Sequence, residues 1–430
     1  MKNSKPAFPK ALEAFKAQYT SNTSNTSSAR NVLKPLAAAL MLAGAATGAQ
    51  AQFSGDVVKI GIITDMSSVY ADIDGAGGVE AVKMAIADAK GQVAGKKIEF
   101  FFADHQNKAD VAASKAREWF DTQGLDLLIG GTNSGTSLAM AKVAAEKKKP
   151  FISIGAGTSR LTNEDCTPFT IHYAYDTVAL ANGTGAAVTK SGGKTWFFLT
   201  ADYAFGTSLQ SDTSAVVTKT GGQVLGSVKH PLNASDFSSF LLQAQSSKAQ
   251  ILGLANAGGD TINAVKAANE FGITKTMKLA GLLMFINDVH SLGLKTTEGM
   301  YLTDSWYWNQ SAESRAWSRR FFEKLKRMPS SLQAADYSAT AHYLKAVEAA
   351  KTDDGEKVIA QMKATPVNDF YTKATIRKED GRAVHDMYLL QVKSQKESTE
   401  PWDYFKVVTR IPGDEAFTKL ADSKCPLVKK

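Results

Sequence analysis

Short hydroxyl and amide side chains gather at one turn of the sequence, in the stretch LIGGTNSGTSLAMAKVA from Leu128 to Ala144. An apolar, strand-like run ends there and a helix-like run begins. Five polar residues lie at the junction: Thr132, Asn133, Ser134, Thr136 and Ser137. This arrangement fits three kinds of chemistry, namely a serine nucleophile, a loop that holds an anion at a helix N-terminus, or simple capping of the helix. The rest of the sequence decides between them.

Three more turns have a similar make-up: IGAGTSRLT (154–162), LTADYAFGTS (199–208) and LANAGGDT (254–261). In an open parallel sheet, ligands bind at the carboxyl ends of the strands, where turns expose backbone N–H groups and helix N-termini. A single turn of this kind is weak evidence, because Ser, Thr, Asn and Asp also cap helices. Two such turns in each half of the chain predict two binding edges that face each other across a cleft.

The usual catalytic motifs are absent from the sequence. There is no G-x-S-x-G around Ser134, no H-E-x-x-H, no G-x-x-x-x-G-K-[ST], and no G-x-G-x-x-G after the first strand-like run. The one S-x-x-K, SGGK at 191–194, is typical of a surface turn, and the six histidines are scattered without metal-ligand spacing. We expect no enzyme, no metal and no cofactor, and we keep a dispersed acid–base pair as the alternative.

Residues 1–51 have the make-up of an exported leader. Six basic residues face only Glu13 in this stretch. The apolar run LAAALMLAGAATG, 36–48, has the length of a signal-peptide core and is too short for a membrane span. It ends at Ala49-Gln50-Ala51, the small-x-small pattern that signal peptidase needs. We predict a signal peptide at 1–51 that is cleaved after Ala51.

Without the leader the charge is nearly balanced. The whole chain has 50 basic and 42 acidic residues, for a formal net charge of +8. The leader holds six of the basic residues and one acidic residue, so 44 and 41 remain and the net charge falls to +3. Because no run of Lys and Arg with interleaved aromatic residues survives, we expect no nucleic-acid partner.

The two cysteines, Cys166 and Cys425, both follow the leader. In an oxidising compartment a lone pair of cysteines is more often bridged than free. We therefore predict a disulfide that ties the C-terminal tail ADSKCPLVKK to the body of the protein. Two separate thiols are the alternative, and neither cysteine has a metal-ligand partner nearby in the sequence.

From Val57 onward, strand-like and helix-like stretches alternate. Apolar runs typical of buried strands occur at 57–64, 97–104, 125–130, 150–155, 169–174, 194–200, 222–229, 249–255, 278–282 and 298–303. Helical spacing separates the first of them at 79–89, 109–122 and 135–147. This alternation predicts parallel sheets that helices cover on both faces, and its two rounds predict two α/β lobes.

The part of the chain after Asp304 mixes both kinds of element. Helix-like segments lie near 312–327, 333–351 and 354–364, and strand-like segments follow at 371–377, 386–393 and 404–410. A mixed block of this kind is what a chain needs in order to cross back between two lobes. No Gly/Ser-rich or Pro-rich linker separates the lobes, which favours several crossing strands over two domains joined by a single tether.

The chain also carries five longer stretches: KIGIITDMSSVYADIDGAGGVEAVKMAIAD, PFISIGAGTSRLT, WFFLTADYAFGTSL, NAGGDTINAVKAANEFGI and TEGMYLTDSWYW. Together they resemble the branched-chain amino-acid-binding (Leu/Ile/Val) family of periplasmic substrate-binding proteins of ABC importers. The resemblance covers residues 57–393. It implies a type I periplasmic binding fold, in which two doubly wound parallel-sheet lobes are joined by three crossing segments. We assign 52–172 plus 304–372 to lobe 1 and 173–303 plus 373–430 to lobe 2.

The resemblance also implies a carboxylate grip in lobe 1. Members of the family hold a ligand carboxylate with a serine and neighbouring N–H groups, and with an Ala-x-Thr turn after the next strand. The matching positions in this chain are Ser134, Ala156 and Thr158. The polar turn of LIGGTNSGTS is therefore expected to receive an anion at a helix N-terminus. Its neighbouring residues are expected to be helpers or caps: Thr132, Asn133, Thr136 and Ser137.

Lobe 2 departs from the family's pattern. Amino-acid binders place an acidic residue just after the strand of KLAGLLMF, where it holds the ligand ammonium. Here that position falls on or next to Leu283, which Met284 and Phe285 follow, and the next acid is Asp288. A buried ammonium at this place would be unpaired, so we expect a carboxylate that lacks the amine.

Two alternatives remain for this region. A shift of a few residues in the comparison would bring Asp260 or Asp288 into the amine-binding role, and the Leu-Met-Phe stretch is also typical of ordinary helix core. In the first interpretation, Tyr70 and Tyr203 extend an apolar, aromatic lining together with Leu283 and Phe285.

Three stretches resemble a subgroup of the family that is associated with benzoate-type and other lignin-derived aromatic acids: TDMSSVYAD, ADHQNK and LTADYAFG. We therefore prefer an aromatic acid or aromatic keto acid as the ligand. Asn256 is a candidate partner for a ring substituent or a keto oxygen, whereas Asp260 either faces the cleft or caps the following helix. The aromatic cluster DSWYWNQ, 304–310, is interpreted as hinge packing.

These expectations describe a periplasmic, monomeric solute-binding protein that captures a small-molecule carboxylate and delivers it to an ABC permease in the inner membrane. A branched-chain amino acid or a small amide is the alternative ligand. Two other classes remain, a ligand-sensing module with the same fold and a secreted hydrolase.

Overall fold

The computed structural model describes residues 53–429. The chain divides into two units, Met1–Gln50 and Ala51–Lys430, and all described residues belong to the second. The predicted signal peptide, 1–51, lies outside the described residues and stays a prediction. Between residues 53 and 429, no helix combines the length and the apolar character that crossing a bilayer would need.

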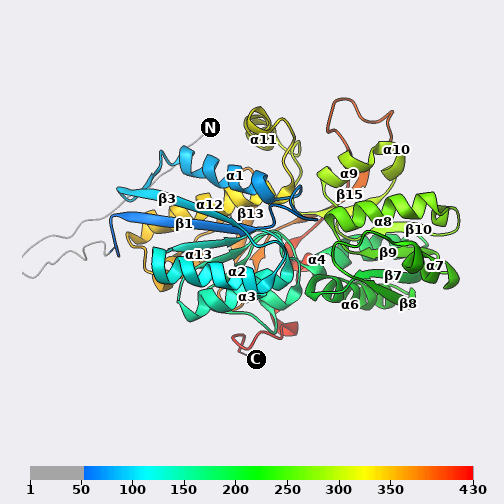
Figure 1. Ribbon diagram of the computed structural model, residues 1–430, viewed down its shortest axis with the longest axis horizontal. Helices are drawn as coiled ribbons and strands as arrows, with labels where there is room; N and C mark the ends of the chain where they lie inside the picture. The colour runs from blue at the N-terminus through cyan, green and yellow to red at the C-terminus, as the bar shows by residue number, and fades with distance from the viewer. Residues whose placement is uncertain (1–52, 430) are drawn as a thin grey trace, which may run out of the picture. The chain divides into compact units, whose positions relative to one another are not determined.

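The first sheet has six strands in the order β2-β3-β1-β4-β5-β6. Strands β1 and β3 lie side by side in it (Figure 1). All of its pairings are parallel except that of the short strand β2 with β3. The strands at its centre are buried along most of their length, as expected for a parallel sheet with both faces covered. Their bounds are β1 Val57–Thr64, β2 Gln92–Val93, β3 Lys96–Asp104, β4 Leu127–Gly130, β5 Phe151–Ser153 and β6 Thr170–His172.

Helices cover both faces of this sheet. Helix α1 packs with α12 on one face, and α2 packs with α3 on the other. Their bounds are α1 Gly75–Asp88, α2 Ala109–Glu118, α3 Ser134–Glu146 and α12 Ser331–Ala350, with α11 Ala312–Leu325 and α13 Gly355–Ala364 beside α12 in sequence.

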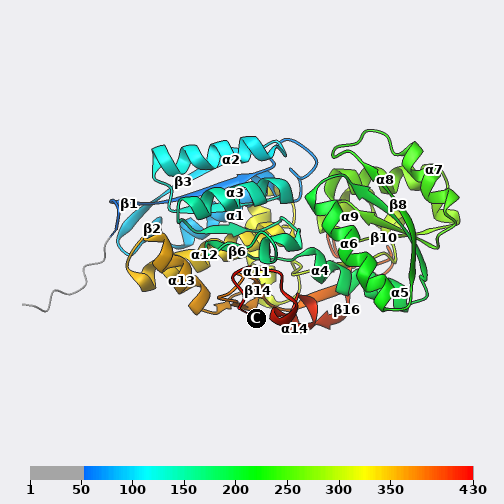
Figure 2. The same cartoon turned by 90° about the horizontal axis from the view of Figure 1, so that it is seen from below.

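The second sheet has four parallel strands in the order β10-β9-β7-β8. Helix α6 lies on one face, and α7 and α8 lie on the other (Figure 2). The element bounds are β7 Thr195–Ala201, β8 Gln223–His230, β9 Ile251–Ala255, β10 Lys278–Gly281, α6 Ala204–Lys219, α7 Ser238–Ser246, α8 Gly258–Glu270, α9 Ile286–Leu292 and α10 Leu294–Thr297. The two rounds of alternating strands and helices predicted from the sequence are therefore confirmed.

Late strands complete the fold in two small antiparallel sheets, β11-β15-β16 and β12-β13-β14. Their bounds are β11 Tyr301–Asp304, β12 Val367–Asn368, β13 Lys373–Ile376, β14 Ala383–Val384, β15 Met387–Val392 and β16 Phe405–Ile411. The remaining short helices are α4 Thr177–Leu180, α5 Ala186–Lys190 and α14 Gly413–Ala416. The predicted assignment of residues 304–430 to the two lobes stays a prediction.

A buried arginine fixes the chain where it leaves the first sheet. The guanidinium of Arg382 donates to the backbone carbonyls of Tyr173 (2.6 Å) and Tyr175 (3.0 Å). It also lies 4.3 Å from the centre of the Phe417 ring. Because Arg382 has no exposed surface, these contacts replace its hydration. They also fix the position of the backbone segment that follows β6.

Helix α1 begins four residues earlier than the expected start at Val79. Three glycines, Gly75, Gly77 and Gly78, obscured this start because glycine is a poor helix former. Close packing against α12 requires two of them, since a Cβ on Gly77 would lie 2.1 Å from the side-chain nitrogen of Gln333 and a Cβ on Gly78 would lie 2.6 Å from Asp336 Oδ2.

The predicted disulfide between Cys166 and Cys425 is confirmed. It joins two residues that are 259 positions apart, and it fastens the tail beside the turn that follows β5. The backbone N–H of Lys424 also donates to Asn163 Oδ1 at 3.0 Å, so the tail is held at two adjacent points.

Replacing both cysteines by serine should lower the free energy of unfolding by about 2–4 kcal/mol, because the bridge restricts a very long loop of the unfolded chain. Urea unfolding followed by tryptophan fluorescence measures this difference. Reducing the natural protein should produce the same loss, and reductant should not affect the double variant. Equal stability of the two proteins under oxidising conditions would contradict the assignment of a stabilising role.

Candidate functional site

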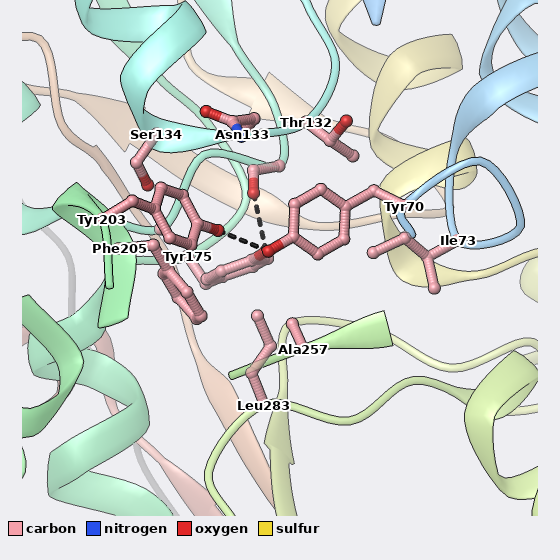
Figure 3. A pocket seen from close by; sticks show the side chains of 12 residues that line it. Tyr70, Ile73, Thr132, Asn133, Ser134, Tyr175, Tyr203, Phe205, Ala257 and Leu283 are labelled. Atoms are coloured by element: carbon pink, nitrogen blue, oxygen red, sulfur yellow. Dashed lines mark hydrogen bonds between the residues drawn. The ribbon is translucent and has the colours of Figure 1, made fainter. Parts of the chain in front are cut away.

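A small cavity lies where the carboxyl ends of both parallel sheets meet (Figure 3). Its free volume is about 10 Å³, far below the roughly 300–1,000 Å³ of most small-molecule pockets, so the walls lie nearly in contact in this structure. Its walls are loops that follow β1, β4, β5, β6, β7, β9 and β10. The lining residues are Tyr70, Ile73, Thr132, Asn133, Ser134, Gly155, Gly157, Tyr175, Tyr203, Phe205, Ala257 and Leu283.

The N-terminus of α3 borders this cavity, since Asn133 and Ser134 belong to the lining. Asn133 is the cap residue, and its side-chain oxygen accepts from the N–H of Thr136 at 3.1 Å. Asn133 has a φ of 67°, a strained conformation for a residue with a side chain. The N–H groups of Ser134 and Gly135 have no acceptor among residues 53–429, so the helix end offers two uncommitted donors together with the positive end of its dipole.

Ser134 connects this turn to the turn after β5. Its hydroxyl oxygen accepts from the backbone N–H of Thr158 at 3.1 Å, which leaves the hydroxyl hydrogen available. Ala156 and Thr158 lie beside the cavity, whose wall at this point is formed by Gly155 and Gly157. The carbonyl of Ala156 accepts from His172 Nε2 at 2.6 Å, and the hydroxyl of Thr158 bonds with that of Ser208 at 2.8 Å.

Four aromatic rings also line the cavity. The hydroxyls of Tyr70 and Tyr203 meet at 2.5 Å, and the hydroxyl of Tyr175 donates to the carbonyl of Gly155 at 2.8 Å. Phe205 lies next to Tyr203, with 6.0 Å between ring centres. Burial raises the pKa of all three tyrosines well above its ordinary value, so they remain neutral donors.

Asp65 and Asn107, which sequence reasoning missed, position both sides of the cavity. The carboxylate of Asp65 accepts from the backbone N–H of Tyr70 at 2.8 Å and from Asn107 Nδ2 at 2.8 Å. Asn107 Oδ1 in turn accepts from Asn133 Nδ2 at 3.1 Å. The Asp-x-x-Ser pattern of TDMSS is a local signal for a turn at Asp65, whereas nothing local in the sequence marks Asn107.

Asn256 and Asp260 lie close to the cavity, but their polar groups bond within the protein. Asn256 accepts from the hydroxyl of Thr261 at 2.7 Å and donates to His230 Nε2 at 3.1 Å. Asp260 accepts from the backbone N–H groups of Asn233 and Ala234, both at 3.1 Å, and burial raises its pKa to about 6. The neighbouring Ala257 lines the cavity in their place.

Asp288 has a similar structural task. It accepts from the backbone N–H of Phe285 at 2.9 Å at the start of α9, and burial raises its pKa to about 7. Phe285 is buried with its ring centre 6.2 Å from that of Tyr175, while Leu283 lines the cavity itself. None of the twelve lining residues is charged.

A pair of buried carboxyls, Asp74 and Asp336, lies directly beneath the site. The hydroxyl of Thr64 donates to Asp74 and lies 3.4 Å from the hydroxyl of Thr132, a lining residue. Burial raises the pKa of both carboxyls, and the charge of Asp74 raises that of Asp336 further. We therefore treat the pair as holding one proton between its two members.

The described residues contain no group of three His, Cys, Asp or Glu side chains that could hold a metal ion. Residues 57–397 match the periplasmic binding protein family. The chain belongs to this family. The predicted type I periplasmic binding fold is confirmed by this match and by the likeness to solved members.

Solved structures extend the comparison. A periplasmic binding protein from Burkholderia mallei is 68% identical, with a TM-score of 0.86 over 87% of this chain and 100% of that one. A branched chain amino acid ABC transporter periplasmic ligand-binding protein from Burkholderia xenovorans LB400 is 39% identical, with a TM-score of 0.77 over 86% and 100%. A solute binding protein of an ABC transporter from Rhodopseudomonas palustris BisB5, in complex with 3,4-dihydroxy benzoic acid, shares the fold at 23% identity, with a TM-score of 0.76 over 86% and 99%.

Curated relatives match over a shorter stretch. The Leu/Ile/Val-binding protein homolog 6 of Brucella melitensis is 24% identical over 233 residues, which are 54% of this chain. The match spans 58% of the length of that relative.

The buried pair Asp74–Asp336 gives this periplasmic binding protein a predictable pH dependence. The folded protein keeps the proton, whereas the unfolded chain releases it above a pKa of about 3.9, so the pair destabilises the fold increasingly as the pH rises above 4. Asparagine is neutral and can donate to Asp74. We therefore expect Asp336→Asn to gain stability over the natural protein between pH 5 and pH 8, by up to about 1.4 kcal/mol for each pH unit.

Urea unfolding of both proteins at pH 5, 6.5 and 8 measures this gain. The exposed Glu379 provides the control, since Glu379→Gln also removes one carboxylate but none that is buried. Its stability difference from the natural protein should hardly change with pH. If the difference in unfolding free energy between Asp336→Asn and the natural protein is the same at all three pH values, the pair holds no extra proton.

Proposed function

We propose that this protein is the solute-binding component of an ABC importer, and that it carries a small aromatic carboxylate to a permease in the inner membrane. One observation carries the proposal. The cavity joins an uncharged aromatic and aliphatic lining to the N-terminus of α3, where two uncommitted N–H groups lie beside the hydroxyl of Ser134. Helices α6 and α8 also begin at the wall of the cavity, at Tyr203 and Ala257, but without a serine hydroxyl among the lining residues there.

The carboxylate is placed at α3. A buried carboxylate is costly to desolvate unless donors replace its water, and charge-assisted hydrogen bonds are the strong ones. The N–H groups of Ser134 and Gly135 and the hydroxyl of Ser134 supply donors at one point. Thr132 and Asn133 line the same end of the cavity, and Ala156 and Thr158 support it from the adjoining turn.

The rest of the ligand meets rings and aliphatic groups. Tyr70, Tyr175, Tyr203 and Phe205 bring aromatic faces and edges together with Leu283, which favours a planar, apolar body. An α-ammonium would enter a wall without a carboxylate, because Asp260 and Asp288 are bonded to backbone N–H groups elsewhere. This lining supports an aromatic acid or aromatic keto acid over an amino acid.

The solved relatives support the class of solute-binding protein, and their names include both types of ligand, an aromatic acid and branched-chain amino acids. The Rhodopseudomonas palustris relative holds 3,4-dihydroxy benzoic acid, whereas the Burkholderia xenovorans relative is named for branched-chain amino acids. We place the protein in the periplasm as a monomer without catalytic activity, exported by the leader at 1–51. Lobe 1 (52–172 plus 304–372) and lobe 2 (173–303 plus 373–430) would close on the ligand by a hinge motion.

A thermal-shift panel tests the ligand class. The protein is first unfolded and refolded to strip carried-over ligand, and is then heated with benzoate, hydroxybenzoates, cinnamates, phenylpyruvate, leucine, isoleucine, valine and short amides. We expect aromatic acids to raise the melting temperature, because a ligand at 100 times its Kd stabilises by about 2.7 kcal/mol. A shift with leucine or valine and none with aromatic acids would overturn the proposed ligand.

Ser134→Ala tests the carboxylate grip. Removing the hydroxyl takes away one donor to a charged group, so the Kd for the best aromatic acid of the panel should rise about tenfold or more by titration calorimetry. Ser137→Ala is the matched control, since Ser137 is buried one turn further along α3 and its hydroxyl has no partner among the described residues. Its Kd should stay within about twofold of the natural value. An equal effect of both substitutions would place the carboxylate elsewhere.

A further inference from the structure

We propose that the hydroxyl pair of Tyr70 and Tyr203 recognises a second oxygen on the ligand, so that the preferred aromatic acids carry a ring hydroxyl or a side-chain keto group. This inference rests on the proposed function and specifies the ligand further. It concerns the hydroxyl groups that the aromatic residues bring to the cavity.

One of the two hydroxyl hydrogens of the pair has no acceptor among residues 53–429. Each phenol has one hydrogen, and at 2.5 Å one phenol donates to the other. The hydrogen of the accepting phenol remains. Neither hydroxyl has another hydrogen-bond partner among residues 53–429, so this donor is left for a group inside the cavity.

The neighbouring side chains offer that donor no free acceptor within the described residues. Tyr175 already donates to the carbonyl of Gly155, and the neighbouring walls are Ile73, Phe205 and Leu283. The pair is partly buried, and a donor that is withdrawn from water without an acceptor costs free energy comparable to a lost hydrogen bond. A ligand oxygen is therefore the partner that this end of the cavity lacks.

Both phenols are held in place by contacts that do not involve a ligand. The backbone N–H of Tyr70 donates to Asp65, and the preceding carbonyl of Val69 accepts from the N–H of Gly259 at 2.9 Å. Gly259 lies in α8, which packs on the second sheet. This contact therefore joins the loop of Tyr70, which follows β1 of the first sheet, to the second sheet. Tyr203 stands at the start of α6, where its N–H donates to the carbonyl of Ala201 at 2.8 Å.

Pre-positioned polar groups select strongly, because a site built to bond a hydroxyl rejects the analogue that lacks it more sharply than an apolar pocket rejects an extra methyl group. A methyl group has nearly the size of a hydroxyl but cannot accept a hydrogen bond. Hydroxybenzoates and methylbenzoates are therefore the matched ligands that expose the role of the pair.

The experiment measures Kd by titration calorimetry for 3- and 4-hydroxybenzoate and for 3- and 4-methylbenzoate. With the natural protein we expect at least one hydroxybenzoate to bind about tenfold or more tightly than its methyl counterpart. The double variant Tyr70→Phe/Tyr203→Phe should bring this ratio close to one while it still binds the methylbenzoate. The single variants each leave one phenol, so they should keep part of the preference.

Tyr175→Phe is the matched control, because it removes a cavity hydroxyl that is already committed to the backbone. It should leave the hydroxy-to-methyl ratio unchanged. Equal affinity of the natural protein for hydroxy and methyl ligands, or an unchanged ratio in the double variant, would overturn this inference and leave the proposed function standing. Failure of every aromatic acid to bind the natural protein would overturn both.

Discussion

The structure depends on one constraint, which is that a buried polar group needs a partner. At the start of α3, folding places two uncommitted N–H groups and a serine hydroxyl against an aromatic cavity. Asn133 satisfies the next N–H of the helix and adopts a left-handed backbone conformation to do so. The side chain of Asn107 holds Asn133 in this strained conformation by accepting a hydrogen bond from it. Asn107 also donates to Asp65, which in turn accepts from the backbone N–H of Tyr70. The donors at α3 and the phenol pair are therefore held by one network.

Parallel sheets explain why groups so far apart in sequence meet. Each strand ends at the same edge as its neighbours, so the turns after β4, β5 and β6 lie side by side, as do those after β7, β9 and β10. The contact between Gly259 and Val69 brings the two edges together. A Cβ on Gly258 would lie 2.4 Å from the carbonyl oxygen of Val69, so a larger side chain there would force the edges apart.

Most elements of the fold could be predicted from the sequence, because buried parallel strands are continuous apolar runs that stand out from the helices between them. Ser134, Tyr70 and Tyr203 could also be placed near a binding edge, since they lie within a few residues of the carboxyl ends of strands. The roles of Asn256, Asp260 and Asp288 were beyond reach, because each depends on a partner from another element or on the exact start of a helix. The same is true of Asn107, whose partners lie 42 and 26 residues away.

The small residues of LIGGTNSGTS serve two surfaces at once. A Cβ on Gly131 would lie 2.0 Å from Asp74 Oδ2, and a Cβ on Gly155 would lie 2.6 Å from the carbonyl oxygen of Gly131. The turns after β4 and β5 therefore pack closely against each other and against Asp74. This packing holds only while the carboxyls of Asp74 and Asp336 stay close together. If the pair carried two charges, the repulsion between Asp74 and Asp336 would act directly on the turn that presents Thr132 and Ser134. A shared proton beneath the site limits the pair to one charge and keeps that turn closed over it, so the shared proton is a condition for the geometry of the donors above.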